Sequence, residues 1–143
     1  MIAEVPQDTA RAVVNMLLRG ALTRFRNIRF IFAHAGGTLP MIAGRIAQYA
    51  SPALIEQLPG GVFAELRRHR YDIGGTANTP AMAALREIAP IGHILFGSDA
   101  PFVPIEGTME ELSRTGLVEN EVDAIRWRNA SCLLHGFKIE CGR

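Results

Sequence analysis

The stretch Ile28-Arg29-Phe30-Ile31-Phe32-Ala33-His34-Ala35-Gly36-Gly37-Thr38-Leu39-Pro40 decides the fold that we expect for this chain. Its nearly continuous apolar run, 28–33, is typical of a parallel strand buried on both faces. His34 follows where the run stops, and the glycine pair behind it permits backbone conformations closed to other residues. Pro40 suits the first position of a helix, which we expect over 41–49. The pattern therefore predicts His34 at the carboxyl end of a strand, where α/β proteins build their sites.

Two further segments repeat this layout of a short apolar stretch followed by glycine. Tyr71-Asp72-Ile73 precedes Gly74-Gly75, and Ile94-Leu95-Phe96 precedes Gly97-Ser98-Asp99. After an irregular lead-in over 1–7, helical spacing and helix-starting residues predict helices over 10–25, 62–66, 79–88, 106–115 and 119–134. The segment 54–58 is expected to be either a short helix or irregular. Strands that alternate with helices predict an α/β fold with a parallel sheet and right-handed crossovers.

Composition and charge restrict the class of protein. The chain has 143 residues, a net charge of +1 and 48% hydrophobic residues, which fits a soluble globular chain of one domain or less. The charge balance gives no electrostatic reason to expect a nucleic acid or a membrane as a partner. No apolar run approaches the roughly 18 residues of a membrane span, and the first residues lack a signal-peptide pattern. Cys132 and Cys141 do not form a metal-type CxxC pair, so we expect reduced thiols in a cytoplasmic protein, with Cys132 in the core.

The three strand ends are expected to bring His34, Asp72 and Asp99 to one edge of the sheet. A histidine and carboxylates gathered there suit a divalent metal and a proton-transfer step. Each residue also has a structural interpretation: His34 can bond to backbone, Asp99 can cap a turn, and Asp72 is expected to fix a loop rather than bind metal.

Other polar residues are expected to serve the surface. His69 and His93 stand beside polar turns and are expected to be exposed. The basic run 67–70 is interpreted as a solvated face of the molecule.

Four segments resemble one protein family. The first is His34-Ala35-Gly36-Gly37-Thr38-Leu39-Pro40 with Gly44-Arg45-Ile46, and the second is Tyr71-Asp72-Ile73-Gly74-Gly75-Thr76-Ala77-Asn78. The third is Ile94-Leu95-Phe96-Gly97-Ser98-Asp99-Ala100-Pro101-Phe102, and the fourth is Asn129-Ala130 with Leu133-Leu134. In order and spacing they resemble strands six, seven and eight and the last helix of the amidohydrolase-related family. That family includes aminocarboxymuconate-semialdehyde decarboxylase and non-oxidative decarboxylases of aromatic acids.

The resemblance implies a metal-dependent (β/α)8 barrel. It implies that Asp99 is a ligand of a divalent metal, Zn²⁺ in the first place with Mn²⁺ as the alternative, and that His34 is the catalytic histidine. Arg45 lies where some of these decarboxylases place an arginine that reaches the substrate carboxylate of a neighbouring subunit; the equal alternative is a surface cation on a helix. The implied substrate is a small aromatic carboxylate, and the implied assembly is a homo-oligomer.

The chain departs from the family in its metal ligands. The family's first-strand His-x-His pair and fifth-strand histidine have no counterpart here, and a complete barrel needs roughly 250 residues. We therefore expect residues 1–143 to form one partial barrel domain, the C-terminal portion with about strands six to eight, and to be inactive alone. Two sheet edges and one side of a barrel core would then lie open.

The activity stays open between two reactions and two other classes of protein. In a decarboxylase, His34 would assist protonation of the carbon that loses CO₂; in a hydrolase, Asp99 and the metal would generate hydroxide. The alternatives are a non-catalytic fragment that self-associates and a small flavodoxin-like α/β binding domain. No phosphate-loop motif follows any of the expected strands, which counts against the binding domain.

Overall fold

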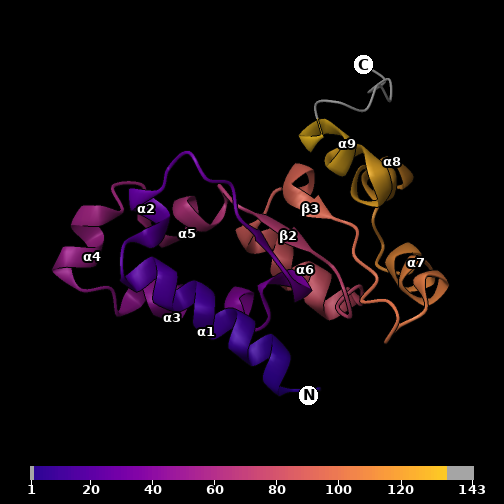
Figure 1. Cartoon of the computed structure of the whole chain (residues 1–143), viewed down its shortest axis with the longest axis horizontal. Coiled ribbons are helices and arrows are strands. Elements are labelled where there is room, and N and C mark those ends of the chain that lie inside the picture. The colour runs from indigo at the N-terminus through magenta and orange to yellow at the C-terminus, as the bar shows by residue number, and fades with distance from the viewer. Residues whose placement is uncertain (1, 135–143) are drawn as a thin grey trace.

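A computed structural model describes residues 2–134 and shows helices packed around one small parallel sheet (Figure 1). The strands are β1 (Ile31–Phe32), β2 (Arg70–Asp72) and β3 (Ile94–Leu95). The α-helices are α1 (Glu4–Leu18), α2 (Ala21–Arg24), α3 (Leu39–Gln48), α4 (Pro52–Gln57), α5 (Gly61–Leu66), α6 (Thr79–Ile88), α7 (Ile105–Ser113), α8 (Glu119–Asp123) and α9 (Asn129–Leu133). Two 3₁₀ turns, η1 (His34–Gly36) and η2 (Ile91–His93), and one π-helical turn, η3 (Ala124–Arg128), complete the described part. No helix within residues 2–134 has both the length and the apolar character that crossing a membrane requires.

The sheet has β2 at its centre and its helix-covered face in the core. Phe32 pairs with Tyr71, and Tyr71 pairs with Ile94, so these side chains share one face. All three are buried, and the Tyr71 hydroxyl donates a hydrogen bond of 3.0 Å to the Leu66 carbonyl. This face therefore joins the strands to the hydrophobic core.

The opposite face of the sheet is open at β1. Ile31 pairs there with Arg70, and the Ile31 side chain is 55% exposed. The strand lies where the apolar run 28–33 predicts it, but the expected burial on both faces is wrong. The physical reason is that the core is assembled on the Phe32 face alone, while Ile31 points away from it.

The N-terminal helix starts earlier than its sequence suggests. Helix α1 begins at Glu4, so the expectation of an irregular lead-in over 1–7 is wrong for the described residues. Pro6 is tolerated because it lies in the first turn, where backbone amides have no partner within the helix. Gly20, at a φ of +69°, separates α1 from α2 and so divides the helix expected over 10–25.

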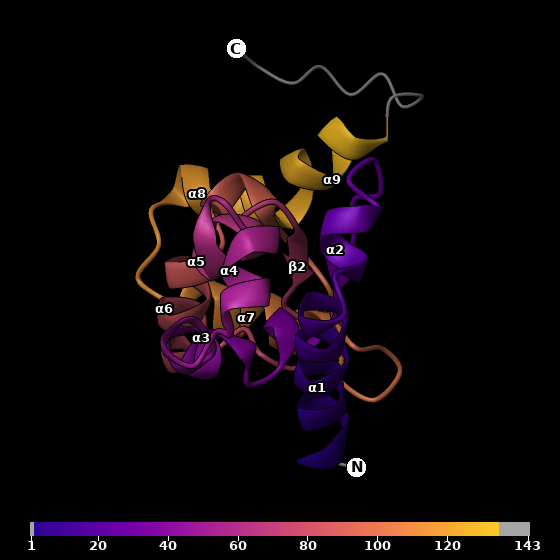
Figure 2. The ribbon, with the colours of Figure 1, turned by 90° about the vertical axis from the view of Figure 1, so that its left-hand side faces the viewer.

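His69 and Cys132 have exposures opposite to those expected. His69 is only 1% exposed because the rings of Phe30 and Phe32 enclose it, with centroids 5.6 and 5.4 Å from the imidazole. Cys132 is exposed rather than in the core, because α9 lies at the periphery of the described chain (Figure 2). His93 is partly exposed. Exposure of a single polar residue or cysteine thus depends on its tertiary neighbours.

The basic run 67–70 is more than a solvated face. Glu65, 4% exposed, accepts a hydrogen bond of 2.7 Å from Arg68, and its other oxygen lies 3.4 Å from the Arg26 guanidinium. Arg68 also donates to the Arg26 carbonyl at 3.1 Å. These contacts tie α5 to the segment that leads into β1.

The two outer edges of the sheet differ. At β3, the Phe96 amide donates to the Ile125 carbonyl at 3.0 Å, and the Asn129 side chain donates to the Ile94 carbonyl at 2.8 Å. The helical segment after α8 therefore occupies this edge. β1 has a neighbouring strand on one side only in the described part of the chain. Of the two open edges expected from sequence, the β3 edge is therefore occupied, and the β1 edge has no further strand within residues 2–134.

We expect the free energy of unfolding to fall as the pH drops below 6.5, the ordinary pKa of histidine. Burial lowers the pKa of His69 and outweighs the opposing attraction of the Glu65 carboxylate. The unfolded chain therefore binds a proton at a higher pH than the folded chain, so the contribution is present above 6.5 and is lost as the pH falls through the lowered pKa. Urea denaturation between pH 7 and pH 5 measures the decline. It should become smaller in His69→Gln and persist in the control His93→Gln; an unchanged decline in His69→Gln would contradict the assignment.

Candidate functional site

Three side chains meet at the carboxyl ends of the strands, as their positions in the sequence predict. The His34 Nε2 atom lies 3.8 Å from Oδ1 of Asp99, too far for a hydrogen bond but close enough for an ion pair when the imidazole is protonated. Asp72 lies between them in sheet order, and its Oδ1 accepts a hydrogen bond of 3.1 Å from the His34 backbone amide. The predicted convergence of His34, Asp72 and Asp99 at one end of a parallel sheet is confirmed.

The backbone that carries His34 is strained. His34 and Ala35 have φ values of +54° and +56°, a left-handed conformation that side chains with a Cβ rarely adopt. Gly36 and Gly37 continue it at +75° and +64°. Such strain persists only where surrounding contacts enforce it, and it is concentrated at functional sites. The glycine pair seen in the sequence thus completes a turn that begins at the histidine itself.

Gly37 is required for a second reason. A Cβ at this position would lie 1.8 Å from the Pro6 carbonyl oxygen, so only glycine lets the first turn of α1 approach this closely. Thr38 supports the same approach by donating to the Gln7 side chain at 2.9 Å. The start of α1 is therefore packed directly against the histidine turn.

Asp72 fixes this geometry from the neighbouring strand. The oxygen that receives the His34 amide also receives the Gly74 amide at 3.0 Å. A Cβ at Gly97 would lie 3.1 Å from the Asp72 side chain, so β3 approaches the same carboxylate closely. The expected loop-fixing contacts of Asp72 are therefore present.

Asp99 combines a turn with a side chain directed at His34. Its φ is +63°, and its carbonyl accepts hydrogen bonds from the amides of Phe102 and Val103. The turn is held through the Asp99 backbone, which leaves the 37% exposed carboxylate to face His34. The turn-capping interpretation and the functional one are therefore compatible.

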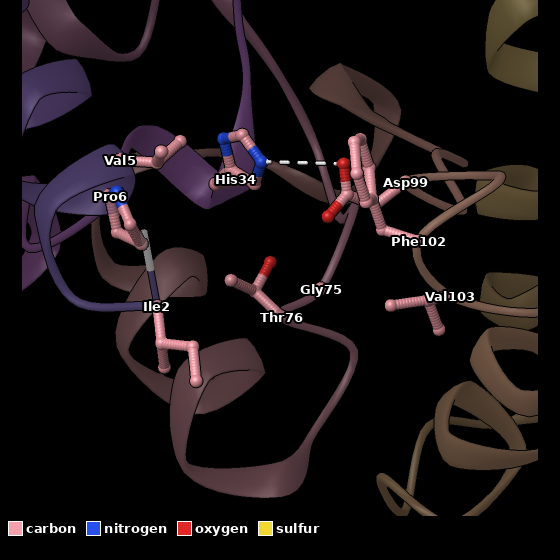
Figure 3. Close-up of a pocket in the computed structure, with 9 residues that line it drawn as sticks. All are labelled: Ile2, Val5, Pro6, His34, Gly75, Thr76, Asp99, Phe102 and Val103. Carbon is pink, nitrogen blue, oxygen red and sulfur yellow. Dashed lines mark ion pairs between the residues drawn. The ribbon is translucent and has the colours of Figure 1, made fainter.

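His34 and Asp99 face each other across a pocket of about 370 Å³ (Figure 3). The start of α1 forms one wall, and the segment after Asp99 forms the other. The Thr76 hydroxyl points toward the pair. The lining residues are Ile2, Val5, Pro6, His34, Gly75, Thr76, Asp99, Phe102 and Val103. Apolar walls around one imidazole and one carboxylate suit a small, largely apolar ligand with an anionic or hydrogen-bonding group.

The pocket contains residues that the sequence interpretation missed. Ile2 and Val5 lie in the segment expected to be irregular, and Val5 reaches the pocket from the first turn of α1. Phe102 and Thr76 belong to the motif segments but carried no recognised role. The sequence did hold a clue to the role of Phe102. It lies three residues after Asp99, and its amide donates a hydrogen bond to the Asp99 carbonyl in the same turn.

Arg45 lies outside this pocket. It is exposed on α3, and its guanidinium carbon lies 4.6 Å from the centre of the Tyr49 ring. Together they border an apolar groove between α1 and α3 that also includes Leu18 and Ile46. Of the three residues singled out from sequence, the structure brings His34 and Asp99 together and places Arg45 elsewhere on the surface.

The described residues contain an incomplete set of metal ligands. Within residues 2–134, no three His, Cys, Asp or Glu side chains are grouped so that they could hold a metal ion. Asp72 directs one oxygen to two backbone amides and does not line the pocket. Of the described side chains that commonly bind metals, His34 and Asp99 line it.

Comparison with known proteins gives a consistent family-level result. A family model described as amidohydrolase matches residues 4–135. Decarboxylase macB of Penicillium terrestre is 31% identical over 131 residues, which cover 85% of this chain and 39% of that protein. The 6-methylsalicylic acid decarboxylase acuB of Aspergillus aculeatus is 32% identical over 132 residues, covering 85% of this chain and 38% of that protein. The chain thus spans less than two fifths of the length of either curated relative.

Solved structures share the same arrangement of elements. A crystal structure described as that of an amidohydrolase II is 29% identical, with a TM-score of 0.79 over 91% of this chain and 42% of that one. A dihydroxybenzoic acid decarboxylase from Polaromonas sp. JS666, described with bound manganese, has a TM-score of 0.76 at 22% identity. It covers 91% of this chain and 40% of that one, and at this identity the likeness concerns the fold. The helices and the small parallel sheet described here are therefore consistent with a part of an amidohydrolase-fold barrel.

We expect Asp72 to contribute to stability and Asp99 to contribute little. In Asp72→Ala the amides of His34 and Gly74 lose their acceptor, at a cost of about 2–3 kcal/mol in the free energy of unfolding. Asp72→Asn keeps an oxygen acceptor and should lose about 1 kcal/mol or less. Asp99→Asn is the matched control, because asparagine tolerates a positive φ and the side chain is partly exposed. Urea denaturation of the four proteins measures this order, and an Asp72→Ala variant as stable as the parent would refute it.

Proposed function

This chain belongs to the amidohydrolase family, and from that premise we propose that it carries the His34–Asp99 half of a metal-dependent decarboxylase site for small aromatic carboxylates. Residues 1–143 would form one partial (β/α)8 domain that corresponds to about strands six to eight. The decarboxylase names of the two curated relatives support this reaction over hydrolysis. We also propose a cytoplasmic location, where the two cysteines, Cys132 and Cys141, would stay reduced thiols.

The proposal rests on the position of His34 opposite Asp99 in the lining of a largely apolar pocket. Apolar walls suit the ring of an aromatic acid, and a histidine at the polar end suits proton transfer. The strained turn supports a functional role for His34, because a merely structural histidine would not need φ of +54°.

In the proposed reaction His34 serves as the proton donor. The bond between the ring carbon and the carboxylate breaks, its electron pair stays on the ring, and CO₂ leaves. His34 delivers a proton to that same ring carbon, which forms the new C–H bond, and then regains a proton from water. The Asp72 contact to the His34 amide keeps the imidazole aimed at the pocket during this step.

Asp99 is the proposed metal ligand, for Zn²⁺ or Mn²⁺. A bound divalent ion would supply a Lewis acid that orients the substrate carboxylate and withdraws charge from it. A catalytic zinc site usually has three protein ligands and one open position. The described residues meet this requirement only in part, since His34 and Asp99 are the two of their His, Cys, Asp and Glu side chains that line the pocket. Further ligands would have to come from outside residues 2–134, so no step of the reaction is assigned to the metal.

We propose that Arg45 contacts the substrate carboxylate of a neighbouring subunit, with a surface cation on α3 as the equal alternative. It lies outside the His34 pocket of its own chain, so it could reach only the carboxylate of a substrate held by a partner in a homo-oligomer. Its stacking on Tyr49 supports the competing role of a surface cation equally well.

We expect the isolated 143-residue chain to bind zinc or manganese weakly and to lack decarboxylase activity. One or two ligands hold a metal loosely, and without the Lewis acid several kcal/mol of transition-state stabilisation are absent. Metal titration by calorimetry, with 6-methylsalicylate turnover measured in parallel, tests this. Submicromolar one-to-one binding with turnover that disappears in Asp99→Ala would overturn it.

In the complete gene product, whatever its length, we expect substitutions of His34 and of Asp99 to impair activity for different reasons. His34→Asn should retain the metal and lose activity by roughly 10²–10⁴-fold, the usual contribution of a general acid. Asp99→Asn should lose metal and activity together, whereas Arg67→Gln, at the exposed position that follows α5, should change neither. Metal content by mass spectrometry and CO₂ release are the measurements. Full activity in His34→Asn would exclude it as the proton donor.

A further inference from the structure

We propose that Thr76 is a specificity-determining residue of the pocket between His34 and Asp99, and that its hydroxyl donates a hydrogen bond to a ring hydroxyl next to the carboxylate of the substrate. The inference rests on the proposed function and deepens it, because it names the residue that distinguishes one aromatic acid from another. His34 and Asp99 serve the carboxylate end of any such acid, whereas Thr76 selects among these acids.

The Thr76 hydroxyl is an exception among the threonines of the described chain. Its Oγ1 atom is buried without a hydrogen-bond partner, and it is the only hydroxyl oxygen in that state within residues 2–134. Buried polar groups in folded proteins are almost always paired, so each unpaired one calls for an explanation. The other six threonine hydroxyls each donate to an oxygen of the protein, and they belong to Thr9, Thr23, Thr38, Thr79, Thr108 and Thr115.

The backbone of Thr76 is held in place beside Asp99. The Thr76 amide donates to the Ile73 carbonyl at 2.9 Å, in the turn that follows β2. Gly75 in this turn has a φ of +60°, and a Cβ there would lie 3.7 Å from Oδ2 of Asp99. The turn therefore packs against the Asp99 carboxylate and presents Thr76 next to it.

The hydroxyl faces the space that the substrate needs. Thr76 lines the pocket together with His34 and Asp99, and its hydroxyl points toward that pair (Figure 3). A protein acceptor in front of this hydroxyl would stand before His34 and Asp99, where the proposed reaction places the substrate. An atom of the ligand is therefore a better partner for the hydroxyl than a further segment of the protein.

A ring hydroxyl next to the carboxylate fits this position. Threonine is neutral, and the substrate carboxylate itself finds a stronger partner in a cationic imidazole or a metal ion. In an aromatic acid with an adjacent hydroxyl, the phenolic proton bonds to the carboxylate, and the phenolic oxygen keeps its lone pairs for a donor such as Thr76. A site that bonds a substrate hydroxyl rejects the analogue that lacks it, because a buried polar group of the site is then left unpaired.

The test measures how the complete gene product, purified with its divalent metal, binds 2-hydroxybenzoate and benzoate. We expect the parent to bind 2-hydroxybenzoate about tenfold more tightly by calorimetry. Thr76→Val has the same shape without the hydroxyl, so its affinity for 2-hydroxybenzoate should fall about tenfold while that for benzoate stays within about twofold. Thr76→Ser should keep the preference. Thr79→Val is the matched control, exposed at the start of α6, and should behave as the parent does.

Thermal unfolding without ligand separates a substrate-binding hydroxyl from a structural one. Thr76→Val should melt at the same temperature as the parent or higher, because it removes a buried hydroxyl that has no partner. If an acceptor outside residues 2–134 bonds the hydroxyl instead, Thr76→Val should melt lower and bind both ligands more weakly by the same factor. That pair of results would overturn the proposal.

Turnover of 6-methylsalicylate distinguishes failure of this inference from failure of the proposed function. Thr76→Val should raise KM about tenfold and change kcat less than about threefold, because the hydrogen bond forms in the ground state and the transition state alike. An unchanged KM would overturn the role of Thr76 and leave the reaction standing. A parent that releases no CO₂ would overturn the proposed reaction, while the two-ligand comparison still decides the role of Thr76. Equal binding of both ligands by the parent, or binding of neither, would overturn the inference without any substitution.

Discussion

The hydrogen bonds that one oxygen of Asp72 accepts from the amides of His34 and Gly74 hold the site together. β1 contributes only Ile31 and Phe32 to the ladder, so the sheet alone cannot dictate the conformation of the turn that follows. That turn places His34 and Ala35 at positive φ, which is unfavourable for residues with a Cβ. A carboxylate that accepts hydrogen bonds from two amides can offset this cost, because bonds to a charged acceptor are stronger than neutral ones.

The turn held by Asp72 explains why the pocket has a polar pair, His34 and Asp99, beside apolar walls. The fixed turn directs the His34 imidazole toward Asp99, and Gly37 lets the first turn of α1 close against it. Ile2 and Val5 then provide an apolar wall opposite Phe102 (Figure 3). A polar pair beside apolar walls can hold a small aromatic acid with its carboxylate at the polar end, which is the basis of the proposed decarboxylation. The amidohydrolase family to which the chain belongs is consistent with this chemistry.

The two edges of the sheet show a second constraint, the need to satisfy backbone groups. At β3 the polypeptide does this itself, through Asn129 and the Ile125 carbonyl of the π-helical turn. Within residues 2–134, β1 has a neighbouring strand on one side only. The described chain therefore satisfies the backbone groups at the β3 edge through its own later segments and does not do so at the β1 edge.

The sequence by itself determined the order of strands and helices and the residues at the strand ends. Apolar runs followed by glycine located all three strands, and helical spacing located α3 and α5 to α9, because these signals are local. The sequence left α4 open between a helix and irregular structure. It also brought His34, Asp72 and Asp99 to one edge, since parallel strands place their carboxyl ends together. Only the tertiary structure decided burial: His69 is enclosed because the rings of Phe30 and Phe32 meet around it, and Ile31 is exposed because the core lies on the other face. It likewise decided that Ile2 and Val5 line the pocket while Arg45 does not, because those positions depend on how α1 and α3 pack rather than on any pattern within them.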